Sequence, residues 1–140
     1  MEELSQLKDY VKSGNYTDAL LLIDELDEMS LSDKINKMFS FSIILLMHLT
    51  KQQAEKKTTP SWDASIAEYL AQIKRSNKRY KTKGFYANKE TIKNILEDAI
   101  PIAIKKAALE VFEGKYSAKE LENLIDRKQI IEKALTLIIE

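Results

Sequence analysis

The sequence contains no cysteine, and it has little glycine, proline or histidine. Without cysteine the chain can form no disulfide, no thiolate zinc site and no cysteine nucleophile, which suits a reducing compartment such as the cytoplasm. Its single histidine, His48, excludes metal sites made of paired histidines. Three glycines and two prolines in 140 residues leave few positions where a helix must stop. We therefore expect a cytoplasmic protein with no metal and no other cofactor.

Long hydrophobic runs and an excess of one charge are missing as well. The longest stretch without a charged residue, Met38 to Thr50, has 13 residues, whereas a membrane-spanning helix needs about 20. The N-terminal residues, MEELSQLKDY, are charged and carry no apolar segment of the kind found in secretory signals. Lys and Arg number 22, as do Asp and Glu, so no bulk field attracts nucleic acid or an anionic membrane. We expect no contact with a membrane.

Apolar residues recur with helical spacing along the whole chain, and no stretch alternates as a strand does. The sequence predicts a single all-α domain over residues 1–140, built as one bundle of five to seven helices. A long central helix over about 31–57 is expected at its centre, because its middle, MFSFSIILLMHL, is apolar on nearly every side. The other expected helices cover about 2–13, 17–29, 61–79, 88–113, a short segment from 117, and 126–139.

Several polar residues have the spacing of helix caps. Ser30 and Asp33 match a capping box at the start of the central helix, and Ser117 and Glu120 match a second one further along the chain. Ser61 follows the segment TTP and is the expected N-cap of the helix over 61–79. These positions predict where the helices begin.

Catalytic motifs are largely missing. The sequence has no Gly-rich phosphate loop and no recognisable Ser–His–acid set, so an acid–base enzyme would depend on His48 or on carboxylates. At about 100° per residue, His48 lies roughly 120° from the centre of the apolar face of its helix. This position favours a hydrogen-bonded histidine inside the bundle, and we predict no catalytic residue. The enzyme alternative requires His48 to line an open cleft.

The only tryptophan, Trp62, opens the next expected helix after the polar segment TKQQAEKKTTPS. Because a helix rises about 1.5 Å per residue, Trp62 should begin some three turns beyond His48. We therefore expect both side chains in the core at separate levels, with Trp62 anchoring the loop and His48 in a polar contact with a neighbouring helix. Burial should lower the pKa of that histidine from about 6.5.

Two blocks of opposite charge divide the sequence. From Ser13 to Asp33 there are six acids and no base, and from Tyr69 to Lys89 there are seven bases and no acid. Tyr80, Phe85 and Tyr86 lie among the bases, as in surfaces that bind phosphates and stack on nucleotide bases. Such bases also occur as plain solvated charges at a helix C-terminus, or against an acidic protein surface. The basic patch consists of Lys74, Arg75, Lys78, Arg79, Lys81, Lys83 and Lys89.

The segments LLMHLTKQ and SWDASI resemble a pattern of the family called domain of unknown function 29, which is abundant in cyanobacteria. Its members carry Leu-Leu-x-His-Leu-x-Lys, a short polar gap, and Ser-Trp-x-x-Ser/Thr-Ile. The resemblance covers about Tyr16 to Ala108, and it marks His48, Lys51, Ser61 and Trp62 as candidate motif residues. It implies an all-α bundle and no established activity. The N-terminal part is shorter here than in that family, and the correspondence beyond the matched range is open.

Two function hypotheses are compatible with these features. The first is a protein–protein interaction module without catalysis, for example one that neutralises a partner as an antitoxin or immunity protein does. The alternative is a nucleic-acid-binding protein or nuclease, in which the basic patch contacts phosphates and His48 catalyses. The missing catalytic motifs and the opposed charge blocks favour a protein partner. The two blocks could also pair with each other, within one chain or between two, and pairing between chains permits a two-fold symmetric dimer in which each block meets its opposite.

Overall fold

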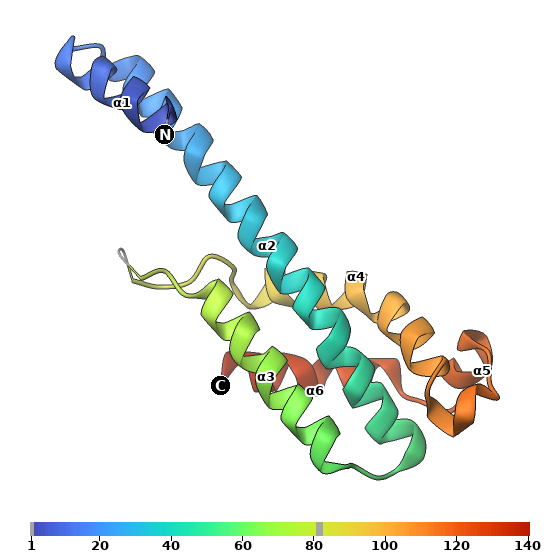
Figure 1. Ribbon diagram of the computed structural model, residues 1–140. Coiled ribbons are helices and arrows are strands. Elements are labelled where there is room, and N and C mark those ends of the chain that lie inside the picture. Colours follow the sequence, from blue (N-terminus) through green and yellow to red (C-terminus); the bar gives the residue numbers. More distant parts are fainter. Residues whose placement is uncertain (1, 81–82) are drawn as a thin grey trace. The chain divides into compact units, whose positions relative to one another are not determined.

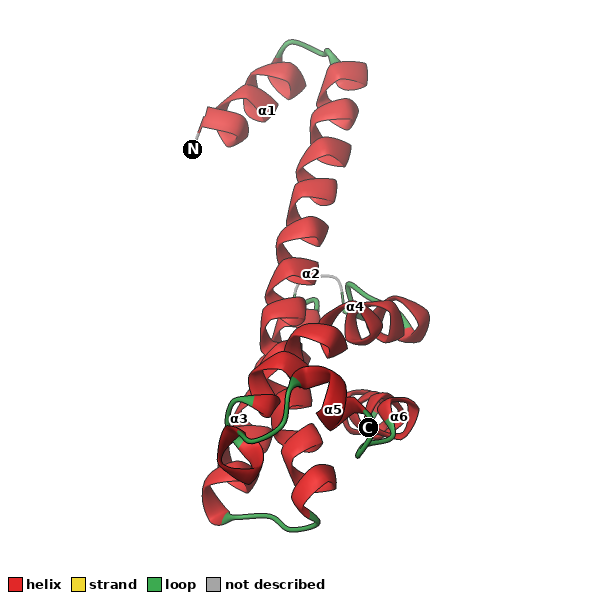
Figure 2. Ribbon diagram, turned by 90° about the vertical axis from the view of Figure 1, so that its right-hand side faces the viewer, coloured by secondary structure: helices red, strands yellow, loops and turns green. Residues whose placement is uncertain are grey.

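Figure 1 shows the computed structural model of the chain, which describes residues 2–80 and 83–140. Within these ranges the backbone forms helices and no strand, so the predicted all-α class is confirmed (Figure 2). An isolated antiparallel bridge pairs Lys78 with Phe85. In chain order the elements are α1 (Glu2–Lys12), α2 (Tyr16–Glu55), α3 (Pro60–Asn77), α4 (Lys89–Ala108), the 3-10 helix η1 (Val111–Gly114), α5 (Ala118–Glu122) and α6 (Arg127–Ile139).

The predicted helix boundary at Ser30 is wrong, because α2 continues through it. The expected helices over 17–29 and 31–57 form one helix of 40 residues, and the proposed capping pair Ser30 and Asp33 lies inside it. Neither glycine nor proline occurs between Gly14 and Pro60, and each further helical residue adds a backbone hydrogen bond, so nothing stops the helix. It ends two residues earlier than expected, where Lys56 adopts a left-handed conformation with φ of 54°.

The remaining boundaries follow local chemistry. Thr59, and not Ser61, caps α3: its hydroxyl accepts a hydrogen bond from the Trp62 backbone N–H at 3.1 Å, because Pro60 occupies the first helical position. The capping box of Ser117 and Glu120 at the start of α5 is confirmed, with hydrogen bonds of 3.1 and 3.2 Å. Asp126 caps α6 through a 3.1 Å bond from the Gln129 N–H.

Helix α4 ends at Ala108, earlier than the predicted end at 113. Three successive residues after it, Phe112, Glu113 and Gly114, have φ values of 50°, 60° and 75°. Left-handed residues cannot continue an α-helix, and non-glycine residues adopt this conformation at a cost in free energy. The chain therefore turns through η1 before α5 begins.

The chain divides into two compact units, Met1–Lys34 and Ile35–Glu140. Since α2 contributes to both, the single domain over residues 1–140 stays a prediction. In the N-terminal unit, α1 lies beside the first turns of α2 (Figures 1 and 2), and Gly14 makes the turn between them with φ of 75°. Ala19 is the one buried residue among the described residues of this unit, at 4% exposure.

The larger unit contains the hydrophobic core. Its centre is formed by fully buried side chains of α2 and α4, among them Leu45, Leu46, Leu96 and Ile104. Helix α4 packs against both α5 and α6, and it buries nine residues along its length. The predicted hub role of the α2 segment around Leu46 is thus confirmed for the core. Among the described residues, no helix combines the length and the apolar composition that a membrane crossing requires.

Candidate functional site

Three of the four candidate motif residues lie in one cluster. His48 and Lys51 are three residues apart near the end of α2, so they project from the same side of the helix. Both are buried, with 8% and 5% of their surfaces exposed. Trp62, in the first turn of α3, lies next to Lys51. It is half-buried and does not belong to the hydrophobic core, so its predicted place in the core is wrong. Ser61 is exposed and takes no part in the cap of α3.

The ammonium group of Lys51 connects three segments of the chain. Its Nζ lies 4.9 Å from the centroid of the Trp62 ring on α3, a distance at which a cation is attracted to the ring face. The same Nζ lies 3.4 Å from Oε2 of Glu110, which follows α4. Lys57 adds a second cation at 5.9 Å from the Trp62 ring. We call His48, Lys51, Trp62 and Glu110 the Lys51 cluster.

Burial controls the chemistry of His48. It lowers the pKa of the imidazole from its ordinary value of 6.5; the Lys51 ammonium lowers this pKa further, whereas the Glu110 carboxylate raises it. The predicted direction is therefore confirmed. The predicted polar contact with a neighbouring helix is not made by Nδ1, which is buried and finds no hydrogen-bond partner among the described residues. An imidazole with 8% exposure does not line an open cleft, which a catalytic role of His48 requires.

The end of α2 makes further polar contacts with distant segments. Gln53 donates from Nε2 to Oε1 of Gln129 on α6 at 2.9 Å, and its Oε1 accepts the backbone N–H of Asp126. Glu55 accepts the backbone N–H of Phe112 in η1 at 3.3 Å. These contacts and the pair of Lys51 with Glu110 were missed by the sequence analysis, since partners so far apart in the chain leave no local signal. Together with the Lys51 cluster, these contacts attach the end of α2 to α3, to the segment after α4, to η1 and to the start of α6.

The basic patch extends from the last turn of α3 through the loop between α3 and α4 to the first residue of α4. Asn77, at the end of α3, is buried at 5% exposure and pairs with the backbone of Ala87 through both atoms of its amide. Its Oδ1 accepts from the Ala87 N–H at 2.7 Å, and its Nδ2 donates to the Ala87 carbonyl at 3.2 Å. The Asn77 carbonyl also accepts from the Tyr86 N–H, and the Arg79 N–H donates to the Gly84 carbonyl, both at 2.9 Å. Sequence reasoning missed Asn77.

This loop exposes aromatic rings among cations. Tyr80 and Phe85 are 68% and 69% exposed, and the Lys78 ammonium lies 5.4 Å from the Tyr80 ring. The Arg79 guanidinium lies 4.4 Å from the ring of Tyr86. Of the predicted basic patch, Lys81 lies outside the described residues; the other members are Lys74, Arg75, Lys78, Arg79, Lys83 and Lys89. We define the basic surface as Lys74, Lys78, Tyr80, Lys83 and Phe85, all of which are exposed.

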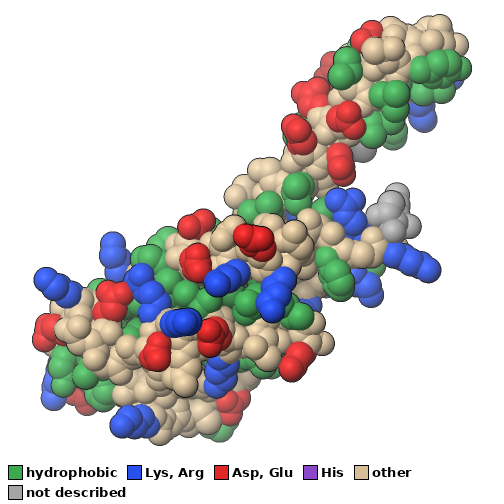
Figure 3. All heavy atoms as spheres, turned by 180° about the vertical axis from the view of Figure 1, so that it is seen from behind, with side chains coloured by type: hydrophobic (Ala, Val, Ile, Leu, Met, Phe, Trp, Pro, Cys, Tyr) green, Lys and Arg blue, Asp and Glu red, His purple; other side chains and the backbone are tan. Residues whose placement is uncertain are grey.

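The acidic block lies on the N-terminal part of α2. Two neighbouring rows of exposed residues, spaced four apart, run along the helix, and each row combines apolar with acidic side chains. In Figure 3, hydrophobic and acidic side chains lie side by side on the N-terminal unit. Leu20 and Leu21 are each 62% exposed, and Met29 is 60% exposed. We define the acidic strip as Leu20, Leu21, Asp24, Glu25, Glu28 and Met29.

The charge of the chain is divided between the two units. Residues 1–34 carry nine acidic and three basic side chains, a net charge of −6. Residues 35–140 carry 13 acidic and 19 basic side chains, a net charge of +6. The overall net charge of zero therefore conceals an acidic unit and a basic one.

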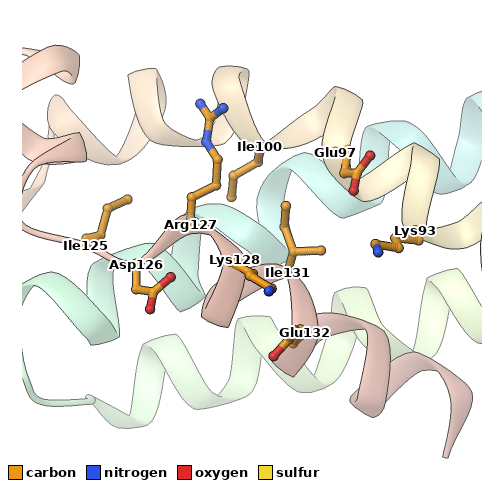
Figure 4. Close-up of a pocket in the computed structure, with 9 residues that line it drawn as sticks. All are labelled: Lys93, Glu97, Ile100, Ile125, Asp126, Arg127, Lys128, Ile131 and Glu132. Atoms are coloured by element: carbon orange, nitrogen blue, oxygen red, sulfur yellow. The ribbon is translucent and has the colours of Figure 1, made fainter.

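A groove of about 850 Å³ lies between α4 and α6 (Figure 4). Its apolar floor includes Ile100 and Ile131, and its rim carries three bases and three acids from the two helices and the segment between α5 and α6. Arg127 on this rim already forms an ion pair with Glu122 at 2.7 Å. The balanced charges favour neither an anionic nor a cationic ligand. No group of three or more His, Cys, Asp or Glu side chains that could hold a metal ion occurs in the described part of the chain.

Comparison with known proteins gives one result. A family model described as Domain of unknown function DUF29 matches residues 2–134, which extends the range of the resemblance at both ends. No curated protein and no solved structure matches the chain. The match includes all residues of the Lys51 cluster, the basic surface and the acidic strip.

Proposed function

The chain belongs to the DUF29 family, and because the family description names no activity, we propose a function from the chain's own surface: it is a non-catalytic protein–protein interaction module. The observation that carries this proposal is the acidic strip of the N-terminal unit. Leu20, Leu21 and Met29 expose about three fifths of their surfaces between carboxylates. Exposed apolar groups gathered on one face and rimmed by charge are typical of protein-binding surfaces.

The interior of the larger unit supports the same proposal. His48 and Lys51 are buried, and Lys51 connects α2 to Glu110, whose side chain is 53% exposed. Such a cluster stabilises a scaffold, whereas a catalytic acid or base must reach its substrate. The function is therefore assigned to the surface of the molecule.

The proposal is tested by quantitative affinity capture from a lysate of the source cell. One bait is the wild type, and a second carries Leu20→Ser and Leu21→Ser on the acidic strip. A matched control replaces Leu109, which is 79% exposed in the larger unit, with serine. We expect the strip variant to lose proteins that the wild type and the Leu109 variant both retain, while circular dichroism shows unchanged helix content. Identical protein lists from all three baits would contradict an interaction through the strip.

A second candidate function, nucleic-acid binding, is favoured by one observation. Tyr80 and Phe85 are exposed among the bases of the loop between α3 and α4, where nucleotide bases could stack while lysines contact phosphates. If so, binding to single-stranded RNA or DNA should weaken steeply with salt, with a slope of about −0.7 per phosphate contacted. Reversal of Lys78, Arg79 and Lys81 to Glu should abolish it. Undetectable or salt-independent binding removes this candidate.

A further inference from the structure

We propose that the acidic strip binds the basic surface of a second copy of the same chain, so that two chains form a reciprocal, two-fold symmetric dimer. This inference rests on the proposed function and names the partner of its interaction surface. The two units carry net charges of −6 and +6, so each unit can attract the oppositely charged unit of a second copy. In a two-fold dimer each contact occurs twice, and no surface of either kind is left over.

The two surfaces have complementary composition. The acidic strip holds three carboxylates, Asp24, Glu25 and Glu28, around exposed apolar side chains. The basic surface holds three ammonium groups around Tyr80 and Phe85, which are more than two thirds exposed. Aromatic side chains are enriched at the centres of protein interfaces, and charged groups there select the partner and its orientation. The carboxylates of the acidic strip can therefore pair with the ammonium groups of the basic surface.

Pairing of two acidic strips with each other is disfavoured by the same charges. It would bring six carboxylates together with no base between them, since the strip has none and the block from Ser13 to Asp33 has none. Like charges placed across an interface oppose association. A basic surface is therefore the occupant that fits the strip best, and the chain itself carries one.

The experiment measures mass in solution by sedimentation velocity for the wild type and two charge-reversed chains. The acid-reversed chain carries Asp24→Lys, Glu25→Lys and Glu28→Lys. The base-reversed chain carries Lys74→Glu, Lys78→Glu and Lys83→Glu. A control reverses three exposed lysines elsewhere in the larger unit: Lys115, Lys119 and Lys133. Circular dichroism of each chain shows whether it has kept the helical fold.

We expect the wild type and the control to sediment at twice the 16.1 kDa chain mass, with a dimer that weakens as salt shortens the screening length from about 8 Å at 0.15 M to about 3 Å at 1 M. Each reversed chain alone should dimerise at least about tenfold more weakly, because its strip and its basic surface then carry like charges. An equal mixture of the two reversed chains should form a dimer again, since in the mixed pair both contacts join opposite charges.

Three results would overturn the inference. The first is a wild type that stays monomeric up to about 100 μM, well above the roughly micromolar dissociation constants at the weak end of specific interfaces. That result leaves another protein as the occupant of the strip, and the capture experiment above still tests the proposed function. A base-reversed chain that dimerises like the wild type would indicate contact between two acidic strips. A mixture that remains monomeric would show that the charges do not face each other. Loss of captured partners by the strip variant, together with a monomeric wild type, would support the module and contradict the dimer.

Discussion

Replacing Asn77 with alanine tests how the loop between α3 and α4 is closed. The substitution removes two hydrogen bonds to the backbone of Ala87, which is 4% exposed and so cannot pair with water instead. Each bond contributes about 0.5–1.5 kcal/mol net, and a buried N–H or C=O left without a partner costs about 1–3 kcal/mol. We expect Asn77→Ala to lower the free energy of unfolding by about 2–4 kcal/mol.

The assay is urea denaturation followed by circular dichroism. With a urea dependence of about 2 kcal/mol per molar, the midpoint should fall by about 1–2 M. Asn77→Asp separates the two bonds: it keeps an acceptor for the Ala87 N–H, but it places a carboxylate oxygen where the amide donated to the Ala87 carbonyl. Its loss should grow as pH rises and the carboxyl ionises. Asn94, exposed on α4, supplies the matched Asn→Ala control, and its effect should stay within about 0.5 kcal/mol. A loss below about 0.5 kcal/mol for Asn77→Ala would refute this account of the loop.

Three further predictions concern the larger unit. Leu46→Ala should lower the free energy of unfolding by about 2–5 kcal/mol, because it opens a cavity at a side chain with no exposed surface. The pKa of the His48 imidazole, measured by NMR, should lie below 6.5. Lys51→Met should raise this pKa because it removes a nearby cation, and Glu110→Gln should lower it because it removes an anion. Because the folded-state pKa of His48 lies below its unfolded value, its contribution to stability is complete above about pH 6.5 and is lost as pH falls through the folded-state pKa. Trp62 emission should stay constant from pH 8 to the onset of unfolding, since Lys51 rather than the imidazole lies over its ring.

Each of these predictions has a control and a contrary result. Leu21→Ala changes a side chain that is 62% exposed in the N-terminal unit, so it should change the free energy of unfolding by less than about 0.5 kcal/mol. If Leu46→Ala had an equally small effect, the hub role of the segment around Leu46 would be contradicted. Shifts of the His48 pKa in the same direction for both charge variants would show that the effect is not electrostatic. A reversible quench of Trp62 near pH 6 that His48→Gln abolishes would place the imidazole against the indole.

Local chemistry determined much of the fold. The capping residues Ser117, Glu120 and Asp126 fix where α5 and α6 begin, because a cap bonds to backbone groups within three residues of itself. Gly14 ends the first helical segment by the conformation it permits. The sequence also predicted the helical class, the buried face around Leu46 and the two charge blocks, because each depends on residue type and spacing alone.

The same local signals failed where two outcomes were both permitted. Ser30 and Asp33 can cap a new helix or continue an old one, and the chain continues because no residue there stops the backbone hydrogen bonding. Thr59 and Ser61 were both able to cap α3, and the proline between them decided in favour of Thr59. At both places the sequence identified the residues that can cap a helix, but it did not determine whether a helix begins there or which residue caps it.

Only the tertiary structure decided which polar groups meet. The contact of Lys51 with Glu110 and the amide pair of Asn77 with Ala87 join segments whose approach depends on how α2, α3 and α4 pack. Packing also decided that His48 is buried while Tyr80 and Phe85 are exposed. Each of these three side chains could by its residue type lie either in the interior or at the surface. Composition and periodicity determine which faces of a helix are apolar, because those depend on neighbours along the chain. The partners of a buried charge or amide are set by the geometry of contacts between distant segments, and that geometry exists only in the folded molecule.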